Sequence, residues 1–333
     1  MSNEQLPLNA EPRAAETGRY HLSRKLLKAF GSRLVDSGIR SIRQIFALAC
    51  AACLLSVFGF QNAHAQINVD STSSAMANTN NLTWSHTIGS GSNRILIISV
   101  SNRDGNKTVT SVTYGGTALT QIGFQNGPGN QNRTSLWKLL APPTGTASIV
   151  VTLSGSVNVV GGAVSFDNVD QTTPHGTFVS ANGTSTTASV NVTSAAGEVV
   201  IDTATANGDA VSLTAGAGQT AQWNTGTGTA GGNVRGGGST EGGAPAVTMS
   251  WTLGASKPWS IGAVSLKPVL VPDITLTKSV NPAGVQPPGT DLTYAVDFSN
   301  GGGVAGSSFL ITDPIPANTD FKVGSVTSSL GKD

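Results

Sequence analysis

The sequence predicts an all-β protein whose main body is a large antiparallel β-sandwich. From Gln66 onward no apolar pattern of helical period occurs, and short runs of Val, Ile, Thr and Ser alternate with Gly, Asn and Asp. Several runs alternate apolar and polar residues, as strands with one buried face do. Core positions of the body also recur at a spacing of 100 to 104 residues, which indicates an internal duplication.

The composition excludes several classes of protein. Charged residues make up 11% of the 333-residue chain, which contains 41 Gly, whereas an average soluble domain carries roughly 25% charge. This composition is unlike that of a typical cytosolic enzyme, and 38% hydrophobic residues with a net charge of +1 argue against disorder. Because no clustered basic surface follows the N-terminus, we expect no nucleic-acid binding.

Residues 1–65 have the features of a helical secretory signal peptide. They carry eight of the 19 basic residues, then the uncharged stretch Ile45–Phe60, then Ala63 and Ala65, the small residues that signal peptidase recognises. We therefore predict cleavage before Gln66. The alternative is a membrane anchor, but an apolar helix of this length spans about 24 Å, less than the roughly 30 Å hydrocarbon core.

Cleavage leaves an exported product without cysteine, because Cys50 and Cys53 both lie in the apolar stretch. The 268 residues from Gln66 hold 11 Lys and Arg against 14 Asp and Glu, a net charge of −3. Without disulfides the product depends on burial and backbone hydrogen bonding, for which its length is sufficient. We expect it outside the cell or at the cell surface or outer membrane, with no membrane span in the mature chain.

The sequence pattern of the body, residues 66–268, predicts strands separated by turns. Residues 247–253 alternate Val, Met, Trp and Leu with Thr and Ser, which predicts a strand with one buried face. The uninterrupted apolar runs Ile95–Ile98 and Val199–Ile201 predict central strands. Turns are predicted at Asp104-Gly105, Gly115-Gly116, Asn182-Gly183 and Asn207-Gly208.

The duplication is clearest where residues 147–166 recur as residues 247–266 without a gap. Two geometries fit it: one large jelly-roll-like sandwich whose halves contribute to both sheets, or two smaller immunoglobulin-like sandwiches in tandem. We favour the single sandwich, because residues 170–187 lack the Pro-rich linker expected between independent domains. Residues 66–268 also resemble a widespread bacterial secreted β-sandwich module, through VTYGGTAL (112–119), GAVSFDNVDQTTP (162–174) and MSWTLGASKPWSIGAVSLKP (249–268). That resemblance implies export and surface display.

A second module follows the Pro-bracketed linker 269–272. Residues 273–328 resemble the domain-of-unknown-function-11 repeat, through DITLTKS (273–279), PGTDLTY (288–294) and ITDPIPANTDF (311–321). That family forms immunoglobulin-like modules in prokaryotic surface proteins and includes the cysteine-rich outer-membrane protein of chlamydiae. The alternation from Leu292 to Ser299 predicts a strand. Because such sandwiches have about 100 residues, we expect the 61-residue module 273–333 to be truncated.

The residues that carry catalysis are scarce, and we predict no enzyme activity. Glu198 and Glu241 are the only Glu after residue 65, a poor supply for the carboxylate pair of a glycoside hydrolase. His86 and His175 have no Gly-x-Ser-x-Gly elbow to supply a nucleophile.

The sequence signals for metal and cofactor binding are no stronger than those for catalysis. Asp167, Asp170 and the loop Asn102–Asn106 offer oxygen ligands for calcium, but turn formation by Asx residues is the favoured explanation. The Gly-rich stretch 231–243 lacks the Gly-Lys-Ser/Thr ending of a phosphate loop and reads as a flexible loop. We predict no cofactor and no metal.

Trp223 is the candidate for ligand binding, because it lies beside a Gly- and Thr-rich loop and carbohydrate-binding sandwiches stack sugars on exposed Trp. The leading hypothesis is an exported cell-surface structural or adhesion-type protein whose partners are surface glycans or other extracellular macromolecules. A carbohydrate-binding module of a secreted protein is the alternative, and a secreted hydrolase is the third class.

Overall fold

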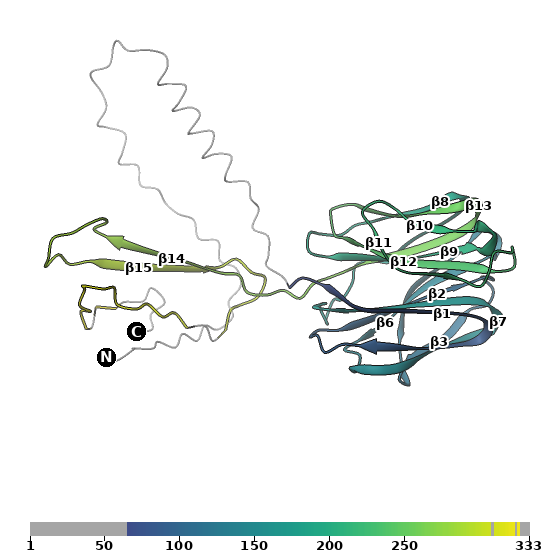
Figure 1. Ribbon diagram of the computed structural model, residues 1–333, viewed down its shortest axis with the longest axis horizontal. Coiled ribbons are helices and arrows are strands. Elements are labelled where there is room, and N and C mark those ends of the chain that lie inside the picture. The colour runs from purple at the N-terminus through teal and green to yellow at the C-terminus, as the bar shows by residue number, and fades with distance from the viewer. Residues whose placement is uncertain (1–64, 308–309, 324, 327–333) are drawn as a thin grey trace, which may run out of the picture. The chain divides into compact units, whose positions relative to one another are not determined.

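Figure 1 shows the computed structural model, which describes residues 65–307, 310–323 and 325–326. The chain divides into two compact units, one spanning His64–Leu270 and one that includes the chain from Val271. The predicted linker 269–272 spans this division. Residues 1–64 of the predicted signal peptide, with its helix and Ala63, lie outside the described residues.

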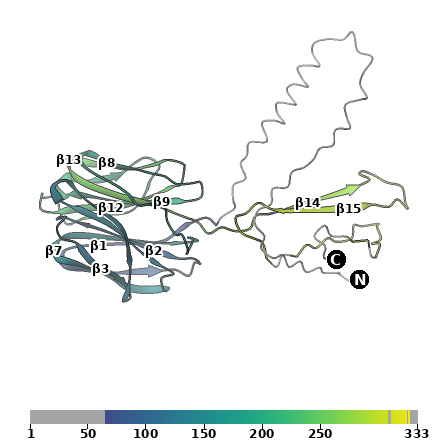
Figure 2. The same cartoon turned by 180° about the vertical axis from the view of Figure 1, so that it is seen from behind.

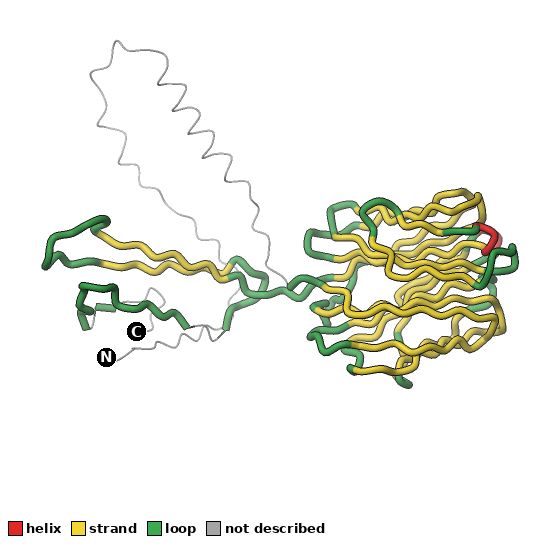
Figure 3. Tube along the Cα trace, in the orientation of Figure 1, coloured by secondary structure: helices red, strands yellow, loops and turns green. Residues whose placement is uncertain are grey.

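The described chain is all-β, as predicted, and Figure 3 shows strands running through most of the larger unit. Two antiparallel sheets form a sandwich there, one above the other in Figures 1 and 2. The first sheet contains β1 (Asn68–Ile88), β2 (Ile95–Asn102), β3 (Val109–Tyr114), β4 (Thr117–Ala118), β5 (Thr120–Asn126), β6 (Arg133–Leu140) and β7 (Gly145–Asp167). The second contains β8 (Val179–Val192), β9 (Val199–Asn207), β10 (Leu213–Ala215), β11 (Thr220–Gly226), β12 (Val234–Gly242) and β13 (Val247–Leu266).

The strand order confirms the predicted duplication. The first sheet runs β4-β3-β7-β2-β6-β5 with β1 also paired to β7, and the second runs β10-β13-β9-β12-β11 with β8 also paired to β13. Apart from β4, each strand of the first half has a counterpart at the same place in the second. The halves do not contribute to both sheets, however. Each half forms one complete sheet, and the two sheets stack into one large sandwich.

The length of β7 explains why each half keeps its own sheet. Its 23 residues pair with β1 from end to end, with β3 near residues 149–153 and with β2 over residues 159–166. The strand therefore passes from an outer layer into an inner layer, and the curled sheet buries a core of its own around Trp137. In the second half β13 pairs in the same way with β10 and β9, and buries a core around Trp251.

A third core lies between the two sheets. It includes Ile95, Ile97 and Phe166 from the first half and Ile201 and Leu266 from the second. Strand β2 is buried along its whole length and β9 nearly so, because each has its own core on one face and the shared core on the other. The prediction that the two apolar runs form central strands is therefore confirmed.

Glycines allow two aromatic rings to enter the shared core. A Cβ at Gly162 or Gly238 would overlap the ring of Trp223, and a Cβ at Gly262 or Gly123 would overlap the ring of Phe178. Each ring thus covers one glycine from each half. Gly162 and Gly262 are equivalent residues of the two halves. Both are required for this close approach, and neither lies in a turn.

One predicted turn is wrong for a related reason. Asn182 and Gly183 lie inside β8, where Gly183 pairs with Trp259 of β13. A Cβ at Gly183 would meet the Trp259 indole at 2.7 Å. This glycine gives a neighbouring strand's ring the space to pack against the backbone, and the Asn-Gly signal for a hairpin is overridden by that packing.

The second unit contains a two-stranded antiparallel sheet among its described residues, formed by β14 (Ile274–Asn281) and β15 (Thr293–Asn300). The predicted alternating strand is confirmed, since Leu276 pairs with Phe298 and Val280 with Tyr294 on the apolar face. On the same face, the Lys278 Nζ lies 2.5 Å from Asp313 Oδ1.

Candidate functional site

The best-organised polar region of the sandwich is a set of four loops at the end opposite Ala65 and Val269. We call this region the loop end. It comprises residues 103–108 and 127–132 of the first half, and residues 208–212 and 227–233 of the second. These loops include the 3-10 helices η1 (Pro128–Asn130) and η2 (Gly208–Ala210). Corresponding backbone bonds close each half, from Gly105 N to Asn130 O at 2.8 Å and from Gly208 N to Asn233 O at 2.8 Å.

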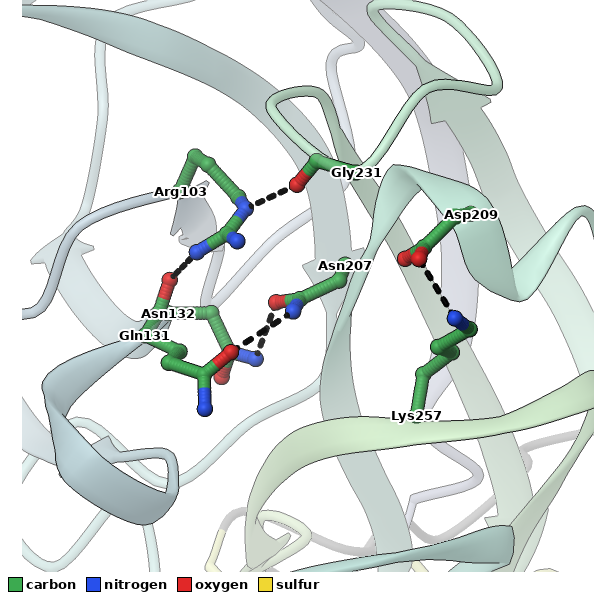
Figure 4. Close-up of polar contacts among 7 residues, drawn as sticks. All are labelled: Arg103, Gln131, Asn132, Asn207, Asp209, Gly231 and Lys257. Atoms are coloured by element: carbon green, nitrogen blue, oxygen red, sulfur yellow. Dashed lines mark hydrogen bonds and ion pairs between the residues drawn. The ribbon is translucent and has the colours of Figure 1, made fainter.

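Side chains tie the loops of the two halves together (Figure 4). Arg103 donates from Nε to the Gly231 carbonyl at 2.6 Å and from Nη1 to the Gln131 carbonyl. Asn132 Nδ2 donates to Asn207 Oδ1 at 3.0 Å, and Asn207 Nδ2 donates to Gln131 Oε1 at 3.2 Å. One guanidinium and three amides therefore hold the two halves in one arrangement.

Asn132 is the centre of this network and is fully buried. Its Nδ2 also donates to the Pro258 carbonyl at 2.9 Å, and its Oδ1 accepts from Ser260 Oγ at 3.0 Å. Because both donors and the acceptor are used, the amide is buried at little cost. A Cβ at Gly127 would overlap the Asn132 side chain, which explains the Gly before η1.

A second network on the first half is a row of amides between a cation and a carboxylate. Arg133 Nη1 donates to Asn126 at 3.2 Å, Asn126 to Asn130 at 3.0 Å, Asn130 to Asn106 at 3.2 Å, and Asn106 to Asp104 at 3.1 Å. Every bond points the same way, from guanidinium to carboxylate. Successive hydrogen bonds in such a row polarise and strengthen one another. The two loops of the first half are therefore rigidly held.

Arg133 itself is unusual for a charged residue because only 7% of it is exposed. Its guanidinium carbon lies 3.7 Å from the centroid of the Phe124 ring, and its Nε has no hydrogen-bond partner. In the described part of the chain the ion pairs within 4.0 Å are Lys257 with Asp209 and Lys278 with Asp313, so no carboxylate neutralises Arg133. Burial lowers the pKa of Arg133 from its usual value.

The carboxylate of Asp202 is fully buried and was not among the residues predicted from the sequence. It accepts hydrogen bonds from Ser239 N and Ser239 Oγ, both at 2.8 Å, and from Trp251 Nε1 at 2.7 Å. By the repeat, Asp202 stands where the first half has Ile98, and Trp251 where it has Val151. Burial raises the pKa of Asp202 to about 7, against the opposing effect of the three donors. The available signal was an Asp directly after the apolar run Val199–Ile201 in a predicted central strand.

His86 forms the matching buried network of the first half. Trp84 Nε1 donates to Ser73 Oγ at 3.0 Å, and Ser73 Oγ lies 2.8 Å from His86 Nδ1. On the other side His86 Nε2 lies 3.3 Å from Ser165 Oγ, which donates to Asp70 at 2.8 Å. This order places the imidazole proton on Nε2. Burial lowers the pKa of His86 to about 4, so the ring is neutral near pH 7.

The prediction that Trp223 is exposed is wrong. Trp223 is only 6% exposed and belongs to the core between the sheets, where its ring lies over Gly162 and Gly238. A residue beside a Gly-rich loop was expected at the surface, but those glycines are the space into which the ring packs. The other Trp residues are buried as well, namely Trp84, Trp137, Trp251 and Trp259. None of the five Trp side chains offers an open face for a sugar.

The other residues singled out by sequence do not converge on one site. Glu198 precedes β9 and Glu241 lies near the end of β12, at the end of the sandwich opposite the loop end. His175 Nδ1 donates to the Gly176 carbonyl at 2.7 Å and its Nε2 faces Lys138 Nζ at 2.8 Å. The prediction that the 231–243 stretch is a flexible loop is wrong for most of its length, since β12 spans Val234–Gly242.

The Asx interpretation of the loop aspartates agrees with the structure. Asp104 Oδ1 accepts from Asn106 N at 2.9 Å, and Asp170 Oδ1 accepts from Thr172 N and Thr173 N at 2.7 and 2.8 Å. Asp167 accepts from Asn68 Nδ2 at 3.0 Å. Within the described ranges no group of three His, Cys, Asp or Glu side chains is placed to hold a metal ion. The same ranges contain no helix that is long and apolar enough to span a membrane.

Ala65 and Gln66, which flank the predicted cleavage point, lie where the sandwich begins. Ala65 N donates to the Val269 carbonyl at 2.9 Å, and the Gln66 carbonyl accepts from Asn168 at 2.9 Å. Ile67 is already part of the shared core. The predicted cleavage site therefore immediately precedes the folded body.

The fold and the loop end together define an all-β sandwich protein built from two equivalent stacked sheets. Comparison with protein-family models, with curated proteins and with solved structures gives no match to this chain.

Proposed function

We propose that this chain is an exported cell-surface protein of structural or adhesive type, without catalytic activity, whose loop end contacts an extracellular partner. The observation that carries the proposal is the network of Arg103, Asn132 and Asn207, which holds loops from both halves in a single arrangement. Loops usually carry recognition but are mobile. Holding them in place lowers the ordering cost of binding.

Export is the second part of the proposal, and it is supported by the sequence before Gln66 and by the position of Ile67 in the core. The domain-of-unknown-function-11 resemblance of residues 273–328 supports the same location. A carbohydrate-binding role loses its Trp platform, because all five Trp are buried. It keeps one exposed aromatic close to the loop end, Phe124 of β5.

Processing of the full-length chain in a Gram-negative bacterial host tests the export step. We expect the exported product to begin at Gln66, as measured by intact mass. Ala65→Asp blocks cleavage, because the residue before the cut must be small. His64→Asp is the matched control and leaves cleavage intact. A wild-type chain found only in the cytosol would falsify the proposal, whereas an exported product that retains residues upstream of Gln66 would contradict the predicted cleavage position.

A further inference from the structure

The charges of the sandwich are segregated between its two ends. Residues 66–268 contain equal numbers of cationic and anionic side chains. The loop end and its adjoining strand ends carry five cations against two anions, namely Arg103, Lys107, Arg133, Arg235 and Lys257 against Asp104 and Asp209. The opposite end carries three cations against five anions, namely Arg94, Lys138 and Lys267 against Asp70, Asp167, Asp170, Glu198 and Glu241. The mature chain is anionic, yet its loop end is cationic.

Most of the loop-end cations have no carboxylate beside them. Lys257 pairs with Asp209 at 2.5 Å, but Arg103 donates only to backbone carbonyls. Arg133 reaches Asp104 only through three Asn side chains. Within the described residues Lys107 and Arg235 form no ion pair within 4.0 Å. The positive field at this end is therefore not cancelled locally, which favours an anionic partner.

The neutral side chains at and near the loop end indicate which chemical class of anionic partner fits. Phe124 of β5 is 48% exposed, with the Arg133 guanidinium carbon 3.7 Å from its ring centroid. Asn106, Asn130 and Gln131 are exposed on the loops of the loop end. An exposed aromatic ring packs against the apolar face of a sugar, and side-chain amides bond to hydroxyl groups. The cations are also few and are spread over the loop 103–108 and the strands β6, β12 and β13. They differ in this from the dense basic surface that duplex DNA attracts with one charge per roughly 1.7 Å.

We propose that the loop end binds a carboxylate-bearing polysaccharide, with one sugar ring against Phe124 and its carboxylates near Lys107 and Arg235. The inference rests on the proposed function, because it takes the loop end as the binding surface of an exported protein. It adds the chemical class of the partner.

Affinity electrophoresis of the mature chain in gels that contain alginate, polygalacturonate or neutral dextran tests the proposal. We expect retardation by a uronate polymer, no retardation by dextran, and loss of retardation as salt rises. The double variant Lys107→Gln with Arg235→Gln should bind about tenfold more weakly. Lys138→Gln with Lys267→Gln removes the same charge at the opposite end, and its binding should stay within about twofold of wild type.

Phe124→Ala separates a sugar site from simple charge attraction. It should weaken binding about tenfold while leaving the salt dependence unchanged, because it removes a contact and no charge. Thermal unfolding of each variant checks that it remains folded. Equal losses in the two double variants, no uronate binding, or equally tight binding of DNA or polyglutamate would overturn the inference. Loop-end-dependent binding to another extracellular partner would leave the proposed function standing.

Discussion

At the residue scale, each half of the sandwich buries a titratable group that its counterpart lacks. Asp202 takes the place of Ile98, and His86 lies where β8 of the second half has Val192. Both groups use their hydrogen-bonding capacity, Asp202 with three donors and His86 with two hydroxyl groups. Buried polar groups of this kind distinguish the two equivalent cores and disfavour pairing of the wrong strands.

The pKa of Asp202 predicts a pH dependence of stability. Its folded value of about 7 is above its usual value of 3.8, so its stabilising effect is fully present below about pH 4 and is lost as pH rises through 7. His86 acts in the opposite sense, because its folded pKa of about 4 is below its usual value of 6.5. Its contribution is present above pH 6.5 and is lost as pH falls toward 4.

Comparing wild type with Asp202→Asn isolates the aspartate, because His86 is present in both proteins. As pH rises from 4 to 8, wild type should lose on the order of 4 kcal/mol of stability relative to the variant. Urea unfolding at each pH measures this difference. A difference that stays constant over the whole range would show that Asp202 does not titrate in the folded protein.

At the scale of elements, the loops between strands are the parts that join the two halves most specifically. The apolar end of the shared core, near Ile95 and Leu266, is formed by non-directional packing. Toward the loop end hydroxyl and amide contacts replace it, such as Thr205 Oγ1 donating to Ser101 Oγ at 2.6 Å. Ser101 and Thr205 are equivalent residues of the two halves. The symmetry of the fold therefore sets the register between the sheets.

Asn132→Ala should loosen this junction. The substitution leaves Ser260, Asn207 and the Pro258 carbonyl without their partner. We therefore expect the free energy of unfolding to fall by about 2 to 4 kcal/mol. Amide hydrogen exchange should also speed up in residues 127–132 and 208–212, because Asn132 joins the first loop to Asn207, which directly precedes the second. Asn191→Ala is the matched control, because Asn191 is exposed and accepts one bond from Thr248 at 2.8 Å. Unchanged exchange in the variant would mean that the loops are held without Asn132.

At the scale of the whole sandwich, the shared core couples the two halves. Each half has its own core, but the inner strands of both are covered only when the sheets are stacked. An isolated half would expose Ile97, Leu136 and Phe166, or their counterparts, to water. A tandem pair of independent domains would leave no such surface.

We therefore predict that the two halves unfold in a single transition. Amides of β2 and β9 should exchange with the same free energy of opening, because neither strand stays covered when the other sheet leaves. Native-state hydrogen exchange at increasing denaturant measures both strands in one experiment. Separate transitions for the two strands would contradict the coupling.

The sequence by itself determined the all-β class, the duplication and the central strands, because side-chain alternation, continuous apolar runs and repeat spacing are local or periodic properties. Only the tertiary structure decided that each half forms one whole sheet, since β7 and β13 pair with strands far away in sequence. It also decided that Trp223 is buried and that the ionisable side chains of Arg133 and Asp202 are buried. Burial depends on what packs against a residue from the other half of the molecule, and the residues next to it in the chain do not contain that information.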